Sequence, residues 1–188
     1  MPLNHNSKYS ELTDQQFILI GKIVIEFSNI EFLLGLLLTR ILLTPSFIGR
    51  TYTDNLNISS VIKAIRNGLE VHAFRYMNRF ITKQTAEEII TLLSKVHKIQ
   101  EIRNRFAHQC FARHTDDAIY GSKLSGDVPK ENSLKPDTSI ITNSQLLELY
   151  SEAFKLVDIL RSVIRRFKEV EELKVIEDLL TDSDSSII

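Results

Sequence analysis

The sequence predicts an all-α protein, a bundle of four or five main helices with a short irregular or β-hairpin insertion before the last long helix. Capping boxes at Thr13–Gln16, Thr85–Glu88 and Thr142–Gln145 mark helix starts, and apolar residues recur three or four apart after each. Six glycines and four prolines in 188 residues leave long stretches without helix breakers. We therefore expect one helical domain over residues 1–180, with the insertion at about 113–142 and a disordered tail at 181–188.

The first predicted helix runs from Thr13 to Thr44, because Pro45 cannot continue it. It is apolar on nearly every side, which is typical of a helix at the centre of a domain or an oligomer. Charged residues such as Lys22 and Arg40 interrupt it too often for a membrane span, so we expect no membrane partner.

Two features of this helix bear on assembly. Gly21, Ser28 and Gly35 recur at heptad spacing, and such a seam fits close packing within the bundle and a dimer contact equally well. Glu31 lies near the centre of the most apolar side, where a carboxylate needs a cationic partner. We expect that partner to be Arg103.

The middle of the chain predicts a loop from Thr44 to Leu56 and then a helix capped by Asn57 or Ser59. Basic and aromatic residues interleave over residues 66–80. This mixture suits nucleic acid, with cations on phosphates and rings under bases. It also suits an amphipathic helix whose arginines extend along the core, which is the interpretation that we favour.

The helix after Thr85 ends in R-N-R-F-A-H, residues 103–108. On a helical wheel Arg103 falls in the apolar stripe, whereas a polar set shares the opposite side: His97, Glu101, Asn104 and His108. If the helix continues, Arg103 and His108 point about 140° apart. Either the helix ends or bends between them, or two copies of the chain build a joint site.

The segment from Gln109 to Thr142 is rich in turn residues. Its β-prone pieces, Cys110–Arg113 and Ala118–Leu124, predict a hairpin, and we expect the remainder to be mobile. The third capping box then opens a long amphipathic helix through Phe167, with a weaker continuation to Leu180.

Signatures of common enzyme classes are missing, since the chain has no Gly-rich phosphate loop, no paired zinc cysteines and no G-x-S-x-G elbow. His97 and Glu101 have the i, i+4 spacing of two metal ligands, but without a third ligand we expect a solvated helix face, no metal and no cofactor. A nucleophilic pair of Cys110 and His114 lacks an orienting group. The lone cysteine and the lack of a secretory signal pattern predict a cytoplasmic protein.

Arg103, Asn104 and His108, late in a helix of an all-helical chain, resemble the Arg-Asn-x-x-x-His signature of the HEPN superfamily. These small α-helical domains are common in prokaryotic defence and toxin–antitoxin systems. The apolar first helix and the long final helix are also similar, so the resemblance spans roughly residues 13–170. The insertion is longer than a minimal domain requires, and nothing carries over to it.

The resemblance implies a homodimer whose two motifs face a shared cleft, and a metal-independent endoribonuclease that leaves 2′,3′-cyclic phosphate ends. His108 would be the general base or acid, Arg103 would stabilise charge on the scissile phosphate, and Asn104 would orient His108 or the phosphate. Arg105 is either a solvated charge or a supplement to the basic character of the cleft. The remaining supporting residues would be Glu31, His97 and Glu101.

Alternatives remain beside this interpretation. Arg103 fits a structural role that ties Glu31 and the helix ends together, and His108 fits a cap on the last carbonyls of its helix. The expected partners are RNA and an antitoxin protein if the chain is a toxin. The alternative function is a non-catalytic HEPN-like module that binds a protein or a nucleotide, which the net charge of −1 favours because RNA binders usually have a basic footprint.

Overall fold

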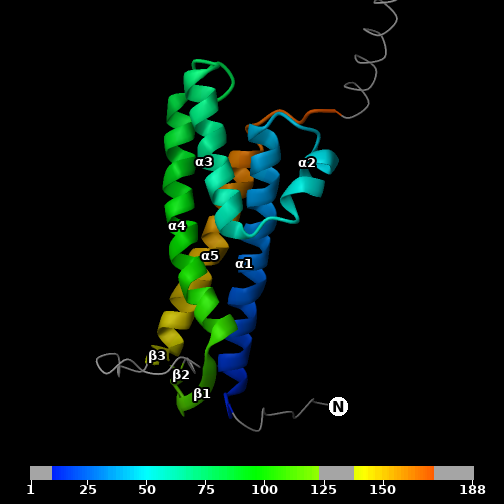
Figure 1. The fold of residues 1–188 in the computed structure, drawn as a ribbon. Helices are drawn as coiled ribbons and strands as arrows, with labels where there is room; N and C mark the ends of the chain where they lie inside the picture. The colour runs from blue at the N-terminus through cyan, green and yellow to red at the C-terminus, as the bar shows by residue number, and fades with distance from the viewer. Residues whose placement is uncertain (1–9, 123–137, 172–188) are drawn as a thin grey trace, which may run out of the picture. The chain divides into compact units, whose positions relative to one another are not determined.

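The fold is known from a computed structural model that describes residues 10–122 and 138–171 (Figure 1). Five helices and three strands lie in these residues: α1 (Asp14–Ile41), α2 (Ser46–Thr53), α3 (Ile58–Phe74), α4 (Lys83–His108), β1 (Cys110–Thr115), β2 (Ala118–Ser122), β3 (Thr138–Thr142) and α5 (Asn143–Ile164). The chain is therefore mostly helical, with a small sheet before the last helix. None of the described helices is both long and apolar enough to cross a bilayer.

The described residues form two compact units. Unit 1 consists of Met1–Asn29 and Lys95–Val157. It contains the start of α1, the end of α4, the sheet and most of α5. Unit 2 consists of Ile30–Ser94 and Asp158–Ile188. It contains the rest of α1, all of α2 and α3, and the start of α4.

Gln16 connects the first turn of α1 to the β-hairpin in unit 1. The capping box is confirmed, because the Thr13 backbone N–H donates to Gln16 Oε1 at 2.9 Å and the Gln16 backbone N–H donates to Thr13 Oγ1 at 3.3 Å. Gln16 is fully buried, and its Nε2 donates to three carbonyl oxygens in the hairpin, those of Thr115, Asp116 and Ala118. One side chain thus starts the helix and fixes the turn beside it.

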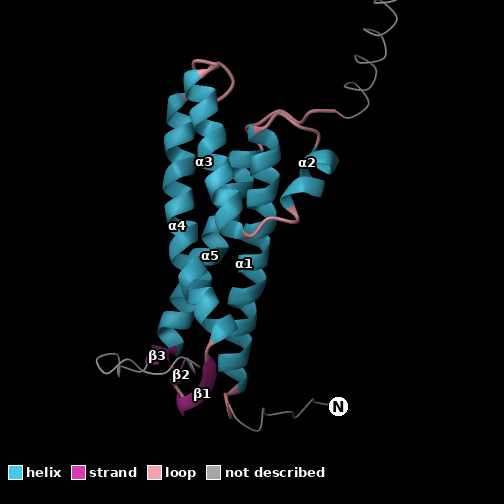
Figure 2. Cartoon of the chain, in the orientation of Figure 1, coloured by secondary structure: helices cyan, strands magenta, loops and turns pink. Residues whose placement is uncertain are grey.

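The three strands form one antiparallel sheet in the order β1-β2-β3 (Figure 2). The predicted hairpin is confirmed as β1 and β2, but β3 is an addition that the sequence did not indicate. The Thr142 capping box at the start of α5 is also confirmed, since the Thr142 backbone N–H donates to Gln145 Oε1 at 2.9 Å. The stretch of the insertion expected to be mobile falls largely on residues 123–137, which lie outside the described residues.

In unit 2, the prediction of a loop from Thr44 to Leu56 is wrong, because most of this segment forms the helix α2. Pro45 is the N-cap residue, where a missing N–H costs nothing. Tertiary contacts hold this short helix: Gly49 packs directly against the Thr39 side chain, and the Arg50 guanidinium lies 4.4 Å from the centroid of the Phe32 ring. A short helix held by packing carries little sequence signal.

Helix boundaries in unit 2 also differ from the prediction. Asn57 caps α3 as expected, accepting the Ser60 backbone N–H at 2.9 Å. The capping residue of α4 is Thr82 rather than Thr85, because Thr82 Oγ1 accepts the Thr85 backbone N–H and the helix begins at Lys83. The first and last helices are shorter than predicted, ending at Ile41 and Ile164. The continuation of the last helix and the disordered tail were predicted for a stretch that lies mostly outside the described residues.

The chain after α5 is tied to the end of α1 through Arg40. This side chain is nine-tenths buried and its Nη2 lies 2.9 Å from Glu169 Oε1. The Ser46 hydroxyl donates to the same carboxylate oxygen at 2.8 Å. The Ser46 hydroxyl and the Arg40 guanidinium hold the pKa of the Glu169 carboxyl below its ordinary value.

Candidate functional site

The Arg-Asn-x-x-x-His residues lie in the last two turns of α4, which is helical through His108. The predicted apolar stripe is confirmed by four buried side chains, those of Ile89, Leu92, Val96 and Ile99. The helix does not end between Arg103 and His108, so their side chains leave it about 140° apart. One copy of this helix therefore cannot aim both side chains at one point.

Arg103 is half-buried, and an aromatic ring holds its guanidinium. The guanidinium carbon lies 5.2 Å from the centroid of the Phe27 ring of α1, and Nη1 donates to Asn104 Oδ1 at 3.3 Å. No carboxylate of the described part of unit 1 pairs with it, which leaves donors for an anionic ligand. Phe27 could not be identified from the sequence, because nothing in the sequence distinguishes it from the other apolar residues of α1.

His108 is exposed at the C-terminal end of α4. Within the described residues of unit 1, its imidazole has no hydrogen-bond partner, and its role as a cap on the last carbonyls of the helix stays a prediction. The Asn104 amide oxygen bonds Arg103 rather than His108. The imidazole is therefore free to meet a ligand.

Two cations precede His108 on α4. Arg105 is exposed and has no ion-pair partner among the described residues of unit 1. Lys98 has the same character and lies seven residues earlier, hence on the same side of the helix. The sequence analysis did not single out Lys98, although its i, i+7 spacing from Arg105 indicates that the two cations share one side of the helix. Together the two make a small basic stripe beside His108.

His97 and Glu101 form an exposed pair on the polar side of α4, with 3.6 Å between Nε2 and Oε1. An exposed i, i+4 pair of this kind contributes little to stability. No group of three His, Cys, Asp or Glu side chains suited to a metal ion occurs in the described ranges. The pair therefore has the geometry of a solvated helix face.

Glu31, the counter-ion expected for Arg103, lies half-buried in α1 and belongs to unit 2. Arg103 belongs to unit 1. The ion pair between the two residues stays a prediction.

No protein-family model, no curated protein and no solved structure matches this chain.

Proposed function

We propose that the chain is a HEPN-like, metal-independent endoribonuclease whose site is completed by two copies of the chain. Arg103 and His108 of each copy serve this site, with Asn104 as a positioning residue. The observation that carries the proposal is the unbroken helix through the motif, because it separates the two side chains within one copy. A facing second copy brings Arg103 of one chain toward His108 of the other.

The chemistry needs a base, an acid and a charge stabiliser. One His108 imidazole takes the proton of the ribose 2′-hydroxyl, and the 2′-oxygen attacks the adjacent phosphorus. The bond from phosphorus to the 5′-oxygen breaks, and a water molecule gives that oxygen its proton, so one pair of Arg103 and His108 is enough for the reaction. The products are a 2′,3′-cyclic phosphate and a free 5′-hydroxyl, and Arg103 stabilises the charge on the phosphoryl oxygens.

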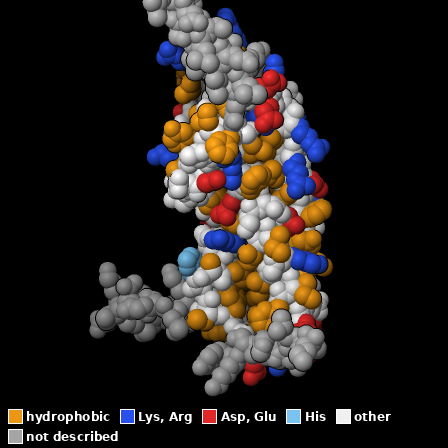
Figure 3. All heavy atoms as spheres, turned by 90° about the vertical axis from the view of Figure 1, so that its right-hand side faces the viewer, with side chains coloured by type: hydrophobic (Ala, Val, Ile, Leu, Met, Phe, Trp, Pro, Cys, Tyr) orange, Lys and Arg blue, Asp and Glu red, His pale blue; other side chains and the backbone are white. Residues whose placement is uncertain are grey.

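An exposed apolar face on α1 supports the homodimer. Ile18 and Ile25 of α1, both in unit 1, are 56% and 61% exposed. Figure 3 shows a face of the protein on which hydrophobic side chains gather. Large exposed apolar patches typically mark interaction sites. Gly21 lies between the two isoleucines, and a Cβ placed there would have no neighbour within 4 Å. Gly35 differs, because its Cβ would lie 2.5 Å from Arg50 Nη1. The small-residue seam is thus open at Gly21 and packed within unit 2 at Gly35.

The resemblance also supplies the biological setting of the proposal. The protein would act in the cytoplasm as the toxin of a defence or toxin–antitoxin system, with an antitoxin as its partner.

The second candidate function is a non-catalytic module that binds a protein or a nucleotide. Two observations favour it: Arg103 already stacks on Phe27, which is a structural contact, and the net charge of the chain is −1. In that case the motif would tie α4 to α1 rather than touch RNA.

The test is cleavage of mixed cellular RNA by purified protein in EDTA, with His108→Ala and Arg103→Lys beside the wild type. The proposal requires cleavage with cyclic phosphate ends, lost in both variants while circular dichroism stays native. His114→Ala is the matched control, because this exposed histidine of β1 lies outside the motif and its loss should leave cleavage intact. Wild-type protein that cuts no RNA, together with an Arg103→Lys variant that is strongly destabilised, would favour the second candidate.

A further inference from the structure

The turn between α3 and α4 exposes an unusual amount of aromatic and apolar surface. We call residues 74–80 the hairpin tip; α3 and the start of α4 lie side by side and this turn joins them (Figure 1). Phe74, Met77 and Phe80 of the tip are 85%, 77% and 60% exposed. The interpretation favoured from the sequence, an amphipathic helix whose arginines extend along the core, holds only as far as Phe74, where α3 ends. The Phe80 ring contacts the rings of His72 and Tyr76 at its edge and is 60% exposed.

The tip is also basic. Between Arg66 and Ala86 the chain carries four cations against one carboxylate, that of Glu70. Arg66, Arg75 and Arg79 are exposed, and none forms an ion pair with a described residue of unit 2. A local concentration of unpaired arginines in a chain of near-zero net charge points to an anionic ligand at this place.

The backbone of the tip is held in one strained conformation. Met77 and Asn78 have φ values of 47° and 58°, a region that costs energy for side chains other than glycine. The Asn78 backbone N–H donates to the His72 carbonyl at 3.0 Å, and buried His72 bonds the Ile41 carbonyl at 2.7 Å. The Tyr76 ring lies 5.4 Å from the His72 ring. The exposed groups are thus presented on a fixed turn, and strain of this kind is concentrated at functional sites.

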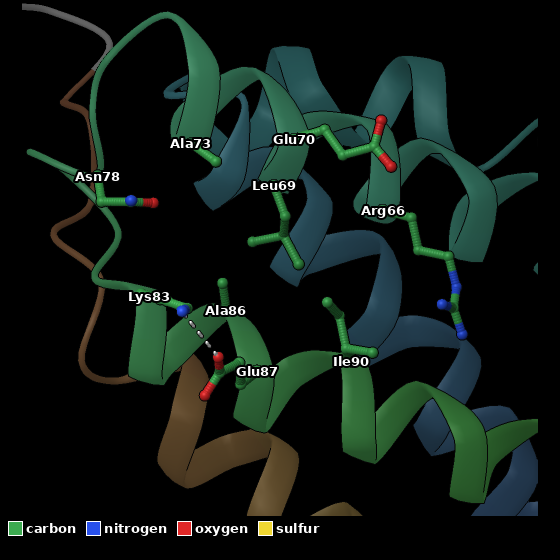
Figure 4. Close-up of a pocket in the computed structure, with 9 residues that line it drawn as sticks. All are labelled: Arg66, Leu69, Glu70, Ala73, Asn78, Lys83, Ala86, Glu87 and Ile90. Atoms are coloured by element: carbon green, nitrogen blue, oxygen red, sulfur yellow. Dashed lines mark ion pairs between the residues drawn. The ribbon is translucent and has the colours of Figure 1, made fainter.

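A groove of about 380 Å³ lies beside the tip, between α3 and α4. Leu69 of α3 faces Ala86 and Ile90 of α4 across it, so its walls are apolar (Figure 4). Asn78 points its amide into the groove from one end, and Arg66 stands at the other (Figure 4).

Neither carboxylate that lines the groove pairs with Arg66. Of the two carboxylates, that of Glu87 pairs with Lys83 at 3.9 Å, and that of Glu70 points away from the cavity (Figure 4). The volume suits a small ligand of about 300 Å³ or more, with a flat apolar body and one hydrogen-bonding edge.

We propose that the hairpin tip and this groove form a binding site for single-stranded RNA, separate from the cleavage motif. Phe74 and Phe80 stack on bases, Arg75 and Arg79 contact phosphates, and one nucleotide enters the groove with its base edge on the Asn78 amide. The site rests on the proposed function for the choice of RNA as the polyanion. It extends that function by giving the RNA a second contact.

An anionic membrane would also attract exposed rings and arginines, but it does not use the groove. A bilayer surface has no group that enters a concave site between two helices and hydrogen-bonds an amide at its end. A nucleotide has a flat base, a hydrogen-bonding edge and a phosphate, which match the walls, Asn78 and the arginines respectively. The groove therefore favours RNA.

The experiment measures binding of a fluorescently labelled single-stranded RNA by anisotropy in EDTA. The full-length His108→Ala protein is the parent, so that the RNA stays intact. Phe74→Ala should weaken binding by about tenfold, the loss expected for one stacked base. Arg75→Ala combined with Arg79→Ala should lower the slope of log affinity against log salt by about 1.4, roughly 0.7 for each lost phosphate contact. Phe47→Ala and Arg161→Ala are matched controls, because both side chains are exposed in unit 2 outside the tip, and they should bind as the parent does.

Binding that is unchanged in the tip variants overturns the inference, even if the wild type cleaves RNA. Binding of phosphatidylglycerol vesicles in place of RNA, lost in the same variants, overturns it in favour of a membrane. Tip-dependent RNA binding by a chain whose wild type cuts no RNA supports this inference while the nuclease proposal fails. The two proposals can therefore fail separately.

Discussion

Arg103 and His108 lie five residues apart on one unbroken helix, so their side chains point about 140° away from each other. Arg103 turns inward to the Phe27 ring of α1, and His108 turns outward into solvent. An arginine and a histidine that serve one phosphate must approach it together. On this geometry the pair can act together only across two copies of the chain.

The exposed apolar face of α1 should be needed for dimerisation. Ile25→Asp places a charge in the centre of this face, and a buried unpaired charge strongly disfavours association. We expect a shift from dimer to monomer in analytical ultracentrifugation and a parallel loss of RNA cleavage. Leu56→Asp, at an exposed leucine outside α1, should remain dimeric. A monomeric wild type that cleaves RNA would contradict the prediction.

Gln16 should be the most sensitive polar residue of unit 1. Gln16→Ala removes the capping contact and the donor to three hairpin carbonyls, of which that of Asp116 keeps another side-chain donor, Asn143 Nδ2. We expect a loss of about 2 kcal/mol or more in the free energy of unfolding, measured with urea. Its neighbour Gln15 is exposed, and Gln15→Ala should change the free energy of unfolding by less than about 0.5 kcal/mol. Equal effects of the two substitutions would show that the buried amide contributes nothing.

Gly68 should not tolerate even one added methyl group. It is buried in α3, and a Cβ there would lie 2.7 Å from Ile41 Cγ2, so Gly68→Ala forces the two helices of unit 2 to shift. We expect it to lower the free energy of unfolding by about 1–3 kcal/mol, although alanine favours a helix. The adjacent exposed Asn67→Ala should instead stabilise the protein by a few tenths of a kcal/mol. Thermal unfolding of both variants checks the contrast.

The contact of Glu169 with Ser46 and Arg40 should weaken in acid. Because the folded pKa of Glu169 is lowered, its stabilising contribution is complete above the unfolded value of about 4.3 and is lost as the pH falls through the folded pKa. The stability difference between the wild type and Glu169→Gln should therefore be larger at neutral pH than in acid. An NMR titration that finds an ordinary pKa for Glu169 would refute the premise.

Features of the fold that depend on local chemistry could be predicted from the sequence. The Thr13 and Thr142 capping boxes, the Asn57 cap and the β1–β2 hairpin each follow from residues close together in the chain, and all are confirmed. The α2 helix and β3 could not be predicted in this way. Packing against Thr39 holds the first, and pairing with β2 holds the second. Such contacts join residues that are distant in the sequence.

In the candidate site, too, the features set by local sequence could be predicted and those set by contacts with distant residues could not. The helical wheel placed Arg103 on the apolar stripe and His108 on the polar side, which agrees with their burial in the structure. The aromatic partner of Arg103 comes from α1 and carries no motif, so only the structure identifies Phe27. The sequence did not indicate that α3 ends at Phe74, nor that the turn after it holds two positive-φ residues, Met77 and Asn78.

The most direct test of a site built by two copies is complementation between two inactive variants. Arg103→Lys and His108→Ala proteins are mixed, unfolded and refolded together, and RNA cleavage in EDTA is compared with that of each variant alone. A mixed dimer restores one intact pair, Arg103 from one copy and His108 from the other, so the account predicts that the mixture regains cleavage. A mixture that forms mixed dimers and stays as inactive as its components, while the wild type cleaves, would contradict it.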